Sequence, residues 1–264
     1  MKVKEVYRKI KNLEIQGAES IAIAGVKALE LKDVSVKKLL NLRPTEPMLY
    51  NAVRFAQKNN VEKTLKYIKK SKQKIIKLGY KRVSDPIFTH CHSSTVVDTF
   101  IYAKKHGKKF EVFNTETRPR YQGRKTAKEL SEANIKVTTF VDSAAKIFIK
   151  KSKVVMFGMD AILTDEKGKI TGVVNKIGSS MFAEIAFDNK IPVYILGNSW
   201  KYAPKKMKIE ERDLKEVWNR TPKKIKIKNP AFDIIEPKHI TAIITELGIL
   251  KPRELSKKVG EKYR

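Results

Sequence analysis

The hydrophobic spacing of this chain changes near Val83, and that change limits the folds open to it. Before Val83, apolar residues recur every three or four positions, as at Val6, Ile10 and Leu13, which predicts amphipathic helices. After Val83, short β-rich runs alternate with amphipathic stretches of helical period. This alternation is typical of an α/β fold with a mostly parallel sheet.

We therefore expect an N-terminal helical domain over residues 1–82 and a C-terminal Rossmann-like α/β domain over residues 83–264 that carries the functional site. A proline-rich break at Leu42–Pro47 should interrupt the helices, because each proline disfavours helix in the residue before it. The predicted strands are 87–90, 110–114, 137–141, 154–157, 193–196 and 242–245, and the predicted helices are 95–106, 123–133, 144–151 and 177–188.

Length and composition favour a soluble protein with a sizeable core. The chain has 264 residues, of which 41% are hydrophobic. Apolar runs such as Ile191–Leu196 are too short to cross a bilayer, so we expect no membrane partner. A single cysteine, Cys91, cannot form an internal disulfide, which fits a reducing compartment, and we predict a cytoplasmic location.

The net charge of +29, from 57 basic and 28 acidic residues, makes nucleic acid a partner to consider. The lysines, however, are spread along the whole chain and form no separate basic tail. We interpret most of this charge as solvated surface, with a local excess that attracts an anionic substrate. Nucleic acid is the less favoured partner.

Four motifs carry the chemistry of the second half of the chain. They are T-H-C-H-S-S around Cys91, T-E-T-R-P-R-Y-Q-G over residues 115–123, F-G-M-D ending at Asp160, and N-K-I-G over residues 175–178. We expect each of them at or just beyond the carboxyl end of a strand, the edge where α/β sheets bind ligands.

Cys91 precedes Ser93, Ser94 and Thr95, which can cap the next helix. A helix N-terminus favours the thiolate and makes a cysteine usable as an acid or base. The alternative is a small buried residue without chemistry. His90 and His92 should lie on opposite faces of an extended segment, so at most one shares the pocket of Cys91. No second Cys or His pair completes a zinc site, and we predict no metal.

Asp160 follows an apolar strand, where partial desolvation would raise its pKa toward acid or base use. The alternative is a turn or helix-capping aspartate. Downstream, residues 165–168 read as a hairpin tip. Asn175 and Lys176 should then start a helix containing Gly178 and face the same crevice as Asp160.

Candidate phosphate ligands lie in loops of the chain. Arg118, Arg120 and Gln122 lie beyond a predicted strand, and the planar fork of arginine suits phosphate. The alternative is a solvated basic loop. Arg43 and Lys201 are further candidates.

Taken in this order, the motifs resemble a family of sugar-phosphate isomerases. It includes archaeal ribose-1,5-bisphosphate isomerase, methylthioribose-1-phosphate isomerase and the alpha, beta and delta subunits of translation initiation factor 2B. The resemblance runs from residue 16 to residue 249, and the T-E-T-R-P-R-Y-Q-G and N-K-I-G segments are most similar to the ribose-1,5-bisphosphate branch.

This resemblance implies that Cys91 and Asp160 are the catalytic pair of an aldose-ketose isomerase acting in nucleoside salvage. It implies a phosphorylated ribose substrate, no cofactor, and a homodimer or homohexamer. The substrate-binding residues that we expect are Gly17, Ala18, Arg43, Ser93, Arg118, Asn175, Lys176 and Lys201.

The chain departs from the family pattern at three places. Gln16 stands where arginine is usual, Met159 replaces alanine in G-A-D, and Asn198-Ser199-Trp200-Lys201 replaces E-T-Y-K. These departures bear on the choice of substrate, so methylthioribose-1-phosphate isomerase stays an alternative. A non-catalytic regulatory protein similar to initiation factor 2B is the other alternative.

Overall fold

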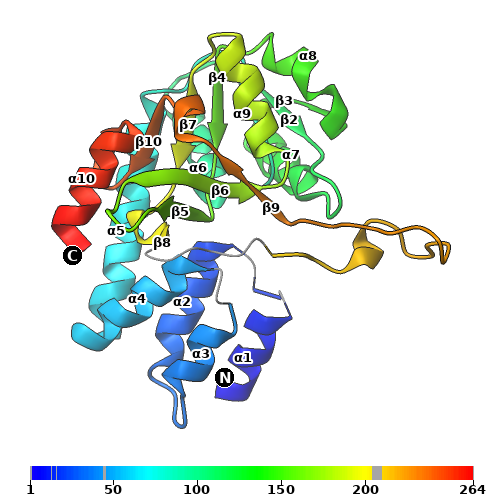
Figure 1. Ribbon diagram of the computed structural model, residues 1–264. Coiled ribbons are helices and arrows are strands. Elements are labelled where there is room, and N and C mark those ends of the chain that lie inside the picture. The colour runs from blue at the N-terminus through cyan, green and yellow to red at the C-terminus, as the bar shows by residue number, and fades with distance from the viewer. Residues whose placement is uncertain (1, 13, 16, 44–45, 204–209, 264) are drawn as a thin grey trace.

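Helices are the only regular secondary structure in the described residues between Val3 and Tyr80, as the spacing predicts. The computed structural model describes residues 2–12, 14–15, 17–43, 46–203 and 210–263. These first helices form the lower lobe in Figure 1. They are α1 (Val3–Lys11), α2 (Ala18–Ala28), α3 (Val36–Asn41), α4 (Pro47–Lys58) and α5 (Val61–Tyr80).

The helices on either side of the proline-rich break end and begin where the sequence predicts, and Pro44 and Thr45 within the break lie outside the described residues. Helix α3 ends at Asn41, and α4 starts with Pro47 in its first turn, where the missing N–H costs nothing. Two positions depart from the family pattern near here. Gln16, in place of the usual arginine, lies outside the described residues, and Met159, in place of alanine, is buried.

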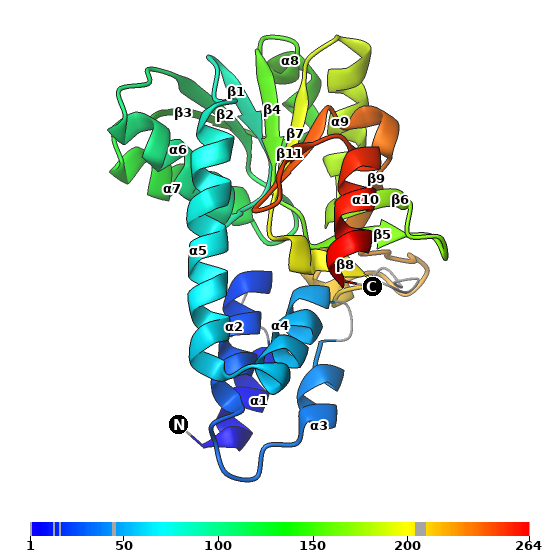
Figure 2. The same cartoon turned by 90° about the vertical axis from the view of Figure 1, so that its left-hand side faces the viewer.

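Helix α5 joins the lobe to the α/β body, and Figure 2 shows it running from one to the other. The side chain of Asn60 caps its start by accepting the N–H of Lys63 at 2.7 Å. Ile68 packs in the core of the lobe, while Ile75 packs in the core on one face of the sheet. One rigid helix of 20 residues therefore fixes how the two parts meet.

The main sheet has seven strands in the order β11-β10-β7-β4-β1-β2-β3. All neighbours are parallel except the edge strand β11, which is antiparallel to β10. The strands are β1 (Ile87–Thr89), β2 (Glu111–Thr115), β3 (Lys136–Phe140), β4 (Val154–Phe157), β7 (Val193–Leu196), β10 (Ala242–Thr245) and β11 (Gly248–Leu250).

Both faces of the central strands are buried, because successive side chains point to opposite faces. Ile87 and Val154 pack under α5, α6 (Ser94–Lys105) and α7 (Gln122–Glu132). Phe88 and Val155 pack on the other face under α8 (Ala145–Ile149), α9 (Ser179–Asp188) and α10 (Pro252–Tyr263). The α/β fold class is thus confirmed, and the predicted strands and helices lie within about two residues of those observed.

A second, four-stranded sheet was not predicted. Its order is β8-β5-β6-β9, and the predicted hairpin tip at residues 165–168 joins its two central strands. The strands are β5 (Ala161–Thr164), β6 (Ile170–Lys176), β8 (Tyr202–Ala203) and β9 (Phe232–Ile235). Outside the two sheets there are also short 3₁₀ helices, namely η1 (Asp142–Ala144), η2 (Ser199–Lys201), η3 (Leu214–Glu216) and η4 (Pro237–His239).

This second sheet corrects one prediction. Asn175 and Lys176 do not start a helix; they end β6 and pair with Asp233 and Phe232 of β9. The helix begins only after Gly178, whose φ of 101° breaks the strand in a conformation that favours glycine. The partner strand comes from more than 50 residues further along the chain, and local spacing could not reveal it.

The division into domains at residue 82 stays a prediction. Within the described residues, no helix is both long and apolar enough to cross a membrane.

Phe88 tests the packing of the sheet, because its buried ring contacts the rings of Phe140, Phe157 and Phe182. We expect Phe88→Ala to lower the free energy of unfolding by about 3–5 kcal/mol, measured by urea denaturation. The control is Ile147→Ala at an exposed site, where we expect a loss below about 1 kcal/mol. Equal losses in both variants would contradict this account of the core.

Candidate active site

The central strands β1 and β4 lie side by side, and the chain leaves them toward opposite edges of the sheet. Such a switch point leaves a crevice at the carboxyl ends of the strands. Cys91 follows β1 and Asp160 follows β4, so both reach this crevice. A Cβ on Gly158 would lie 2.6 Å from the Cβ of Ser93, and the absence of a side chain there lets the two loops touch.

Neighbouring loops hold the backbone of Cys91 firmly. Its φ of 66° is unusual for a residue with a side chain. Its N–H donates to the hydroxyl of Thr117 at 3.0 Å, and its carbonyl accepts from the hydroxyl of Thr126 at 2.9 Å. The carboxylate of Asp142 in turn accepts the N–H groups of Thr117 and Arg118 at 2.8 and 2.6 Å. The T-E-T-R loop therefore acts as a support for the cysteine.

The left-handed turn at Cys91 also replaces the extended segment that we predicted around it. His92 lines the cavity, while His90 is buried beneath it, so one histidine shares the pocket. Burial lowers the pKa of His90 to about 4 and keeps the ring neutral. Its Nε2 faces the carbonyl of Ile177 at 2.9 Å and must donate, so its Nδ1 accepts from Thr115 at 2.6 Å.

Burial, not the helix N-terminus, decides the state of the thiol. Ser93 takes the N-cap position of α6, but its side chain makes no capping bond. Cys91 is only partly exposed, and burial raises its pKa to about 12, although the nearby Lys176 ammonium lowers it. With this raised pKa, Cys91 is a neutral thiol at neutral pH and not the thiolate that we expected.

Asp160 lies among cations. Its N–H donates to the carbonyl of Val174 at 2.8 Å, which fixes the start of β5. Burial raises the pKa of Asp160, as we predicted, while Lys201, Lys176, Arg43 and Arg212 all oppose that rise. The ammonium of Lys201 donates to the carbonyl of Met159 beside it.

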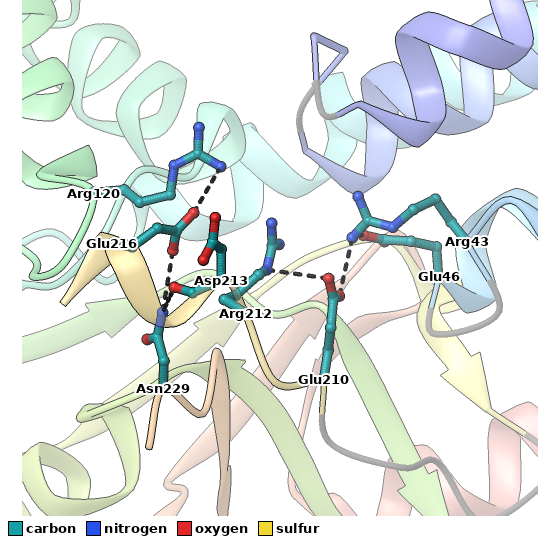
Figure 3. Close-up of polar contacts among 8 residues, drawn as sticks. All are labelled: Arg43, Glu46, Arg120, Glu210, Arg212, Asp213, Glu216 and Asn229. Atoms are coloured by element: carbon teal, nitrogen blue, oxygen red, sulfur yellow. Dashed lines mark hydrogen bonds and ion pairs between the residues drawn. The ribbon is translucent and has the colours of Figure 1, made fainter. Parts of the chain in front are cut away.

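The helical lobe contributes a buried ion pair to the same place (Figure 3). Arg43 contacts Glu46 at 3.0 Å, and both side chains are almost fully buried. Burial raises the pKa of Glu46 to about 7, with a further rise from Asp160, whereas Arg43 lowers it. The Oε2 atom of Glu46 has no hydrogen-bond partner among the described residues. Glu46 can therefore hold a proton near neutral pH beside Asp160.

These groups surround a cavity of about 240 Å³. Nine of the predicted site residues line it, and Arg118 does not. The guanidinium of Arg118 instead donates to the Tyr121 hydroxyl at 2.7 Å and to the Val217 carbonyl at 3.3 Å. The nine are Gly17, Ala18, Arg43, Cys91, Ser93, Asp160, Asn175, Lys176 and Lys201.

Of the three candidate phosphate ligands in the R-P-R loop, Arg120 and Gln122 line the cavity and Arg118 does not, a difference that the motif alone could not reveal. Sequence reasoning missed several other lining residues. Glu46 lies within the predicted break but carried no signal of its own. Other missed residues are Lys72, Lys125 and Arg212, which lie outside the four motifs.

Comparison with known proteins agrees with the resemblance found in the motifs. A ribose 1,5-bisphosphate isomerase of Methanocaldococcus jannaschii is 38% identical and covers 95% of this chain and 92% of that protein. A protein of the same name from Archaeoglobus fulgidus is 33% identical, and the match covers 95% of this chain and 90% of that protein.

Solved structures share the fold. The crystal structure named translation initiation factor eIF-2B from Pyrococcus horikoshii OT3 has a TM-score of 0.83 at 28% identity, covering 95% of this chain and 97% of its own. The crystal structure of 5-methylthioribose 1-phosphate isomerase from the same organism has a TM-score of 0.75 at 24% identity. The match covers 99% of this chain and 88% of that chain.

The Initiation factor 2 subunit family model matches residues 14–252, nearly the whole chain. With relatives above 30% identity over most of its length, this chain belongs to the Initiation factor 2 subunit family.

Proposed function

We propose that this protein is an isomerase that converts ribose-1,5-bisphosphate to ribulose-1,5-bisphosphate. The observation that carries the proposal is that Cys91 and Asp160, two groups able to exchange protons, line one cavity rich in cations. The relatives named ribose 1,5-bisphosphate isomerase support the same substrate.

Two anion-binding regions suit a bisphosphate. In the first, the N-termini of α2 and α6 both line the cavity, and neither has a side-chain cap, so their first N–H groups are open to an anion. Lys72 bridges them through Glu19 at 3.4 Å and Ser94 at 3.3 Å. The second region consists of the cations around Asp160, namely Arg43, Lys176, Lys201 and Arg212.

The chemistry needs one acid and one base, and no redox step. Phosphate on the C1 oxygen makes the anomeric centre an acetal, so the ring oxygen must receive a proton before the ring opens. The hydrogen on C2 then moves to C1, and the C2 hydroxyl loses its proton to the base, so that a ketone remains at C2. We assign these proton transfers to Cys91 and Asp160, with the cations holding the phosphates near the reacting carbons.

The fold likeness to a protein named eIF-2B favours a second candidate, a non-catalytic regulatory protein. Against it, a binding scaffold has no chemical need for a buried thiol and a buried carboxyl in one cationic cavity. Salt-sensitive RNA binding without isomerase activity would favour this candidate.

We further propose a cytoplasmic homo-oligomer, either a dimer or a hexamer. Helix α9 presents Met181 and Phe187, each about half exposed, which would bury apolar surface in such an assembly.

The first test follows ribose-1,5-bisphosphate by phosphorus and carbon NMR. We expect the wild type to form ribulose-1,5-bisphosphate, and Cys91→Ser and Asp160→Asn to lower turnover by about 10²- to 10⁴-fold each, because each removes a proton-transfer group. Asp188→Asn, at the exposed end of α9, is the matched control and should leave turnover unchanged. A wild type inactive on this substrate and on methylthioribose-1-phosphate would refute the proposal.

The state of the thiol gives a separate prediction. Because burial raises the pKa of Cys91 to about 12, little thiolate exists at neutral pH. We expect iodoacetamide to alkylate it at least about tenfold more slowly than free cysteine at pH 7.5, with a rate that still rises beyond pH 9. Protein unfolded in urea, with an ordinary thiol, is the control. A rate that levels off near pH 7 would instead indicate a lowered pKa.

A further inference from the structure

Residues 210–231 form an arm whose two ends are tied together at the mouth of the cavity. The N–H of Arg212 donates to the carbonyl of Asn229, and that of Ala231 to the carbonyl of Glu210, both at 2.9 Å. Figure 1 shows the rest of the arm extending away from the body beside β9. These two hydrogen bonds therefore hold both ends of the arm beside the cavity.

Ion pairs connect the arm to cavity-lining arginines from other parts of the chain (Figure 3). Glu210 contacts Arg43 of the helical lobe at 3.4 Å, and Glu216 contacts Arg120 of the loop after β2 at 3.6 Å. Asn229 steadies Glu216 with a hydrogen bond of 3.3 Å. The arm is thus docked on two separate walls of the cavity.

Arg212 is the arm residue that enters the cavity lining. Glu210 engages only its Nε, at 3.1 Å. Its terminal Nη atoms have no hydrogen bond or ion pair within the described part of the chain, although the side chain is only 16% exposed. Arg212 is close enough to Asp160 and Lys176 to lower the pKa of both. A guanidinium that lines the cavity with both outer nitrogens unpaired is suited to bind an anion there.

We propose that Arg212 is a phosphate ligand of the substrate, and that Glu210 is the positioning residue that aims it. Held by Nε, the guanidinium keeps both Nη groups for a bidentate contact with one phosphate. Because Glu210 also contacts Arg43, it sets the spacing of two guanidinium groups in the second anion region. This inference rests on the proposed function and extends it to a residue outside the four motifs.

The test measures binding rather than turnover, by calorimetry with ribulose-1,5-bisphosphate, ribose-1-phosphate and ribose-5-phosphate. Arg212→Gln should lower the affinity for the bisphosphate by about tenfold to a hundredfold, the usual effect of a lost charged contact. Of the two monophosphates, the variant should bind more weakly only the one whose phosphate contacts Arg212. Its affinity for the other monophosphate should equal that of the wild type. Glu210→Gln should give a smaller loss with the same selectivity.

Two variants guard against misfolding and general charge effects. Arg212→Lys keeps the charge without the fork and should show an intermediate loss. Arg220→Gln removes an exposed arginine from the same arm and should bind like the wild type. Thermal melting of each variant checks that it is folded.

The outcomes separate the two proposals. A wild type that binds none of the three sugars overturns the proposed function and this inference together. A wild type that binds, with Arg212→Gln binding equally well, overturns this inference alone. An equal loss for the bisphosphate and both monophosphates also overturns it, because general electrostatics or a structural defect would then explain the effect.

Discussion

The parallel pairing of β1 with β4 is the constraint on which the rest of the site depends. Ile87 pairs with Val154 and Phe88 with Val155, so the two strands end at the same edge of the sheet. The loops that follow carry Cys91 and Asp160, and Gly158 lets these loops approach closely. A shift in this register would separate the thiol from the carboxyl, however well each loop was formed.

Desolvation and cationic charge compete at the three acidic groups Cys91, Asp160 and Glu46. Burial raises the pKa of Cys91, Asp160 and Glu46, while the surrounding ammonium and guanidinium groups lower it. Burial is the larger influence in each case, and an anionic substrate would offset part of the cationic charge. The same cations thus serve two purposes, because they draw phosphate into the cavity and limit the cost of its buried carboxyls.

Much of the fold could be predicted from local patterns. The strands of the main sheet are short and rich in β-branched residues, and their two buried faces produce the apolar runs that the sequence displays. The second sheet escaped prediction because β6 finds its partner in β9, a contact between distant segments. The same reason explains the misplaced helix start at Asn175 and Lys176, whose extended conformation comes from that pairing.

The sequence by itself determined the α/β class and the motifs at the strand ends, because hydrophobic period and turn chemistry are local properties. Its resemblance to a known family also named nine of the residues that line the cavity. Only the tertiary structure decided that Arg120 and not Arg118 faces the cavity, that burial raises the pKa of Cys91, and that Arg212 of a distant arm lines the same cavity as Asp160. Those outcomes depend on burial and on contacts between residues far apart in the chain, and a local stretch of sequence specifies neither of them.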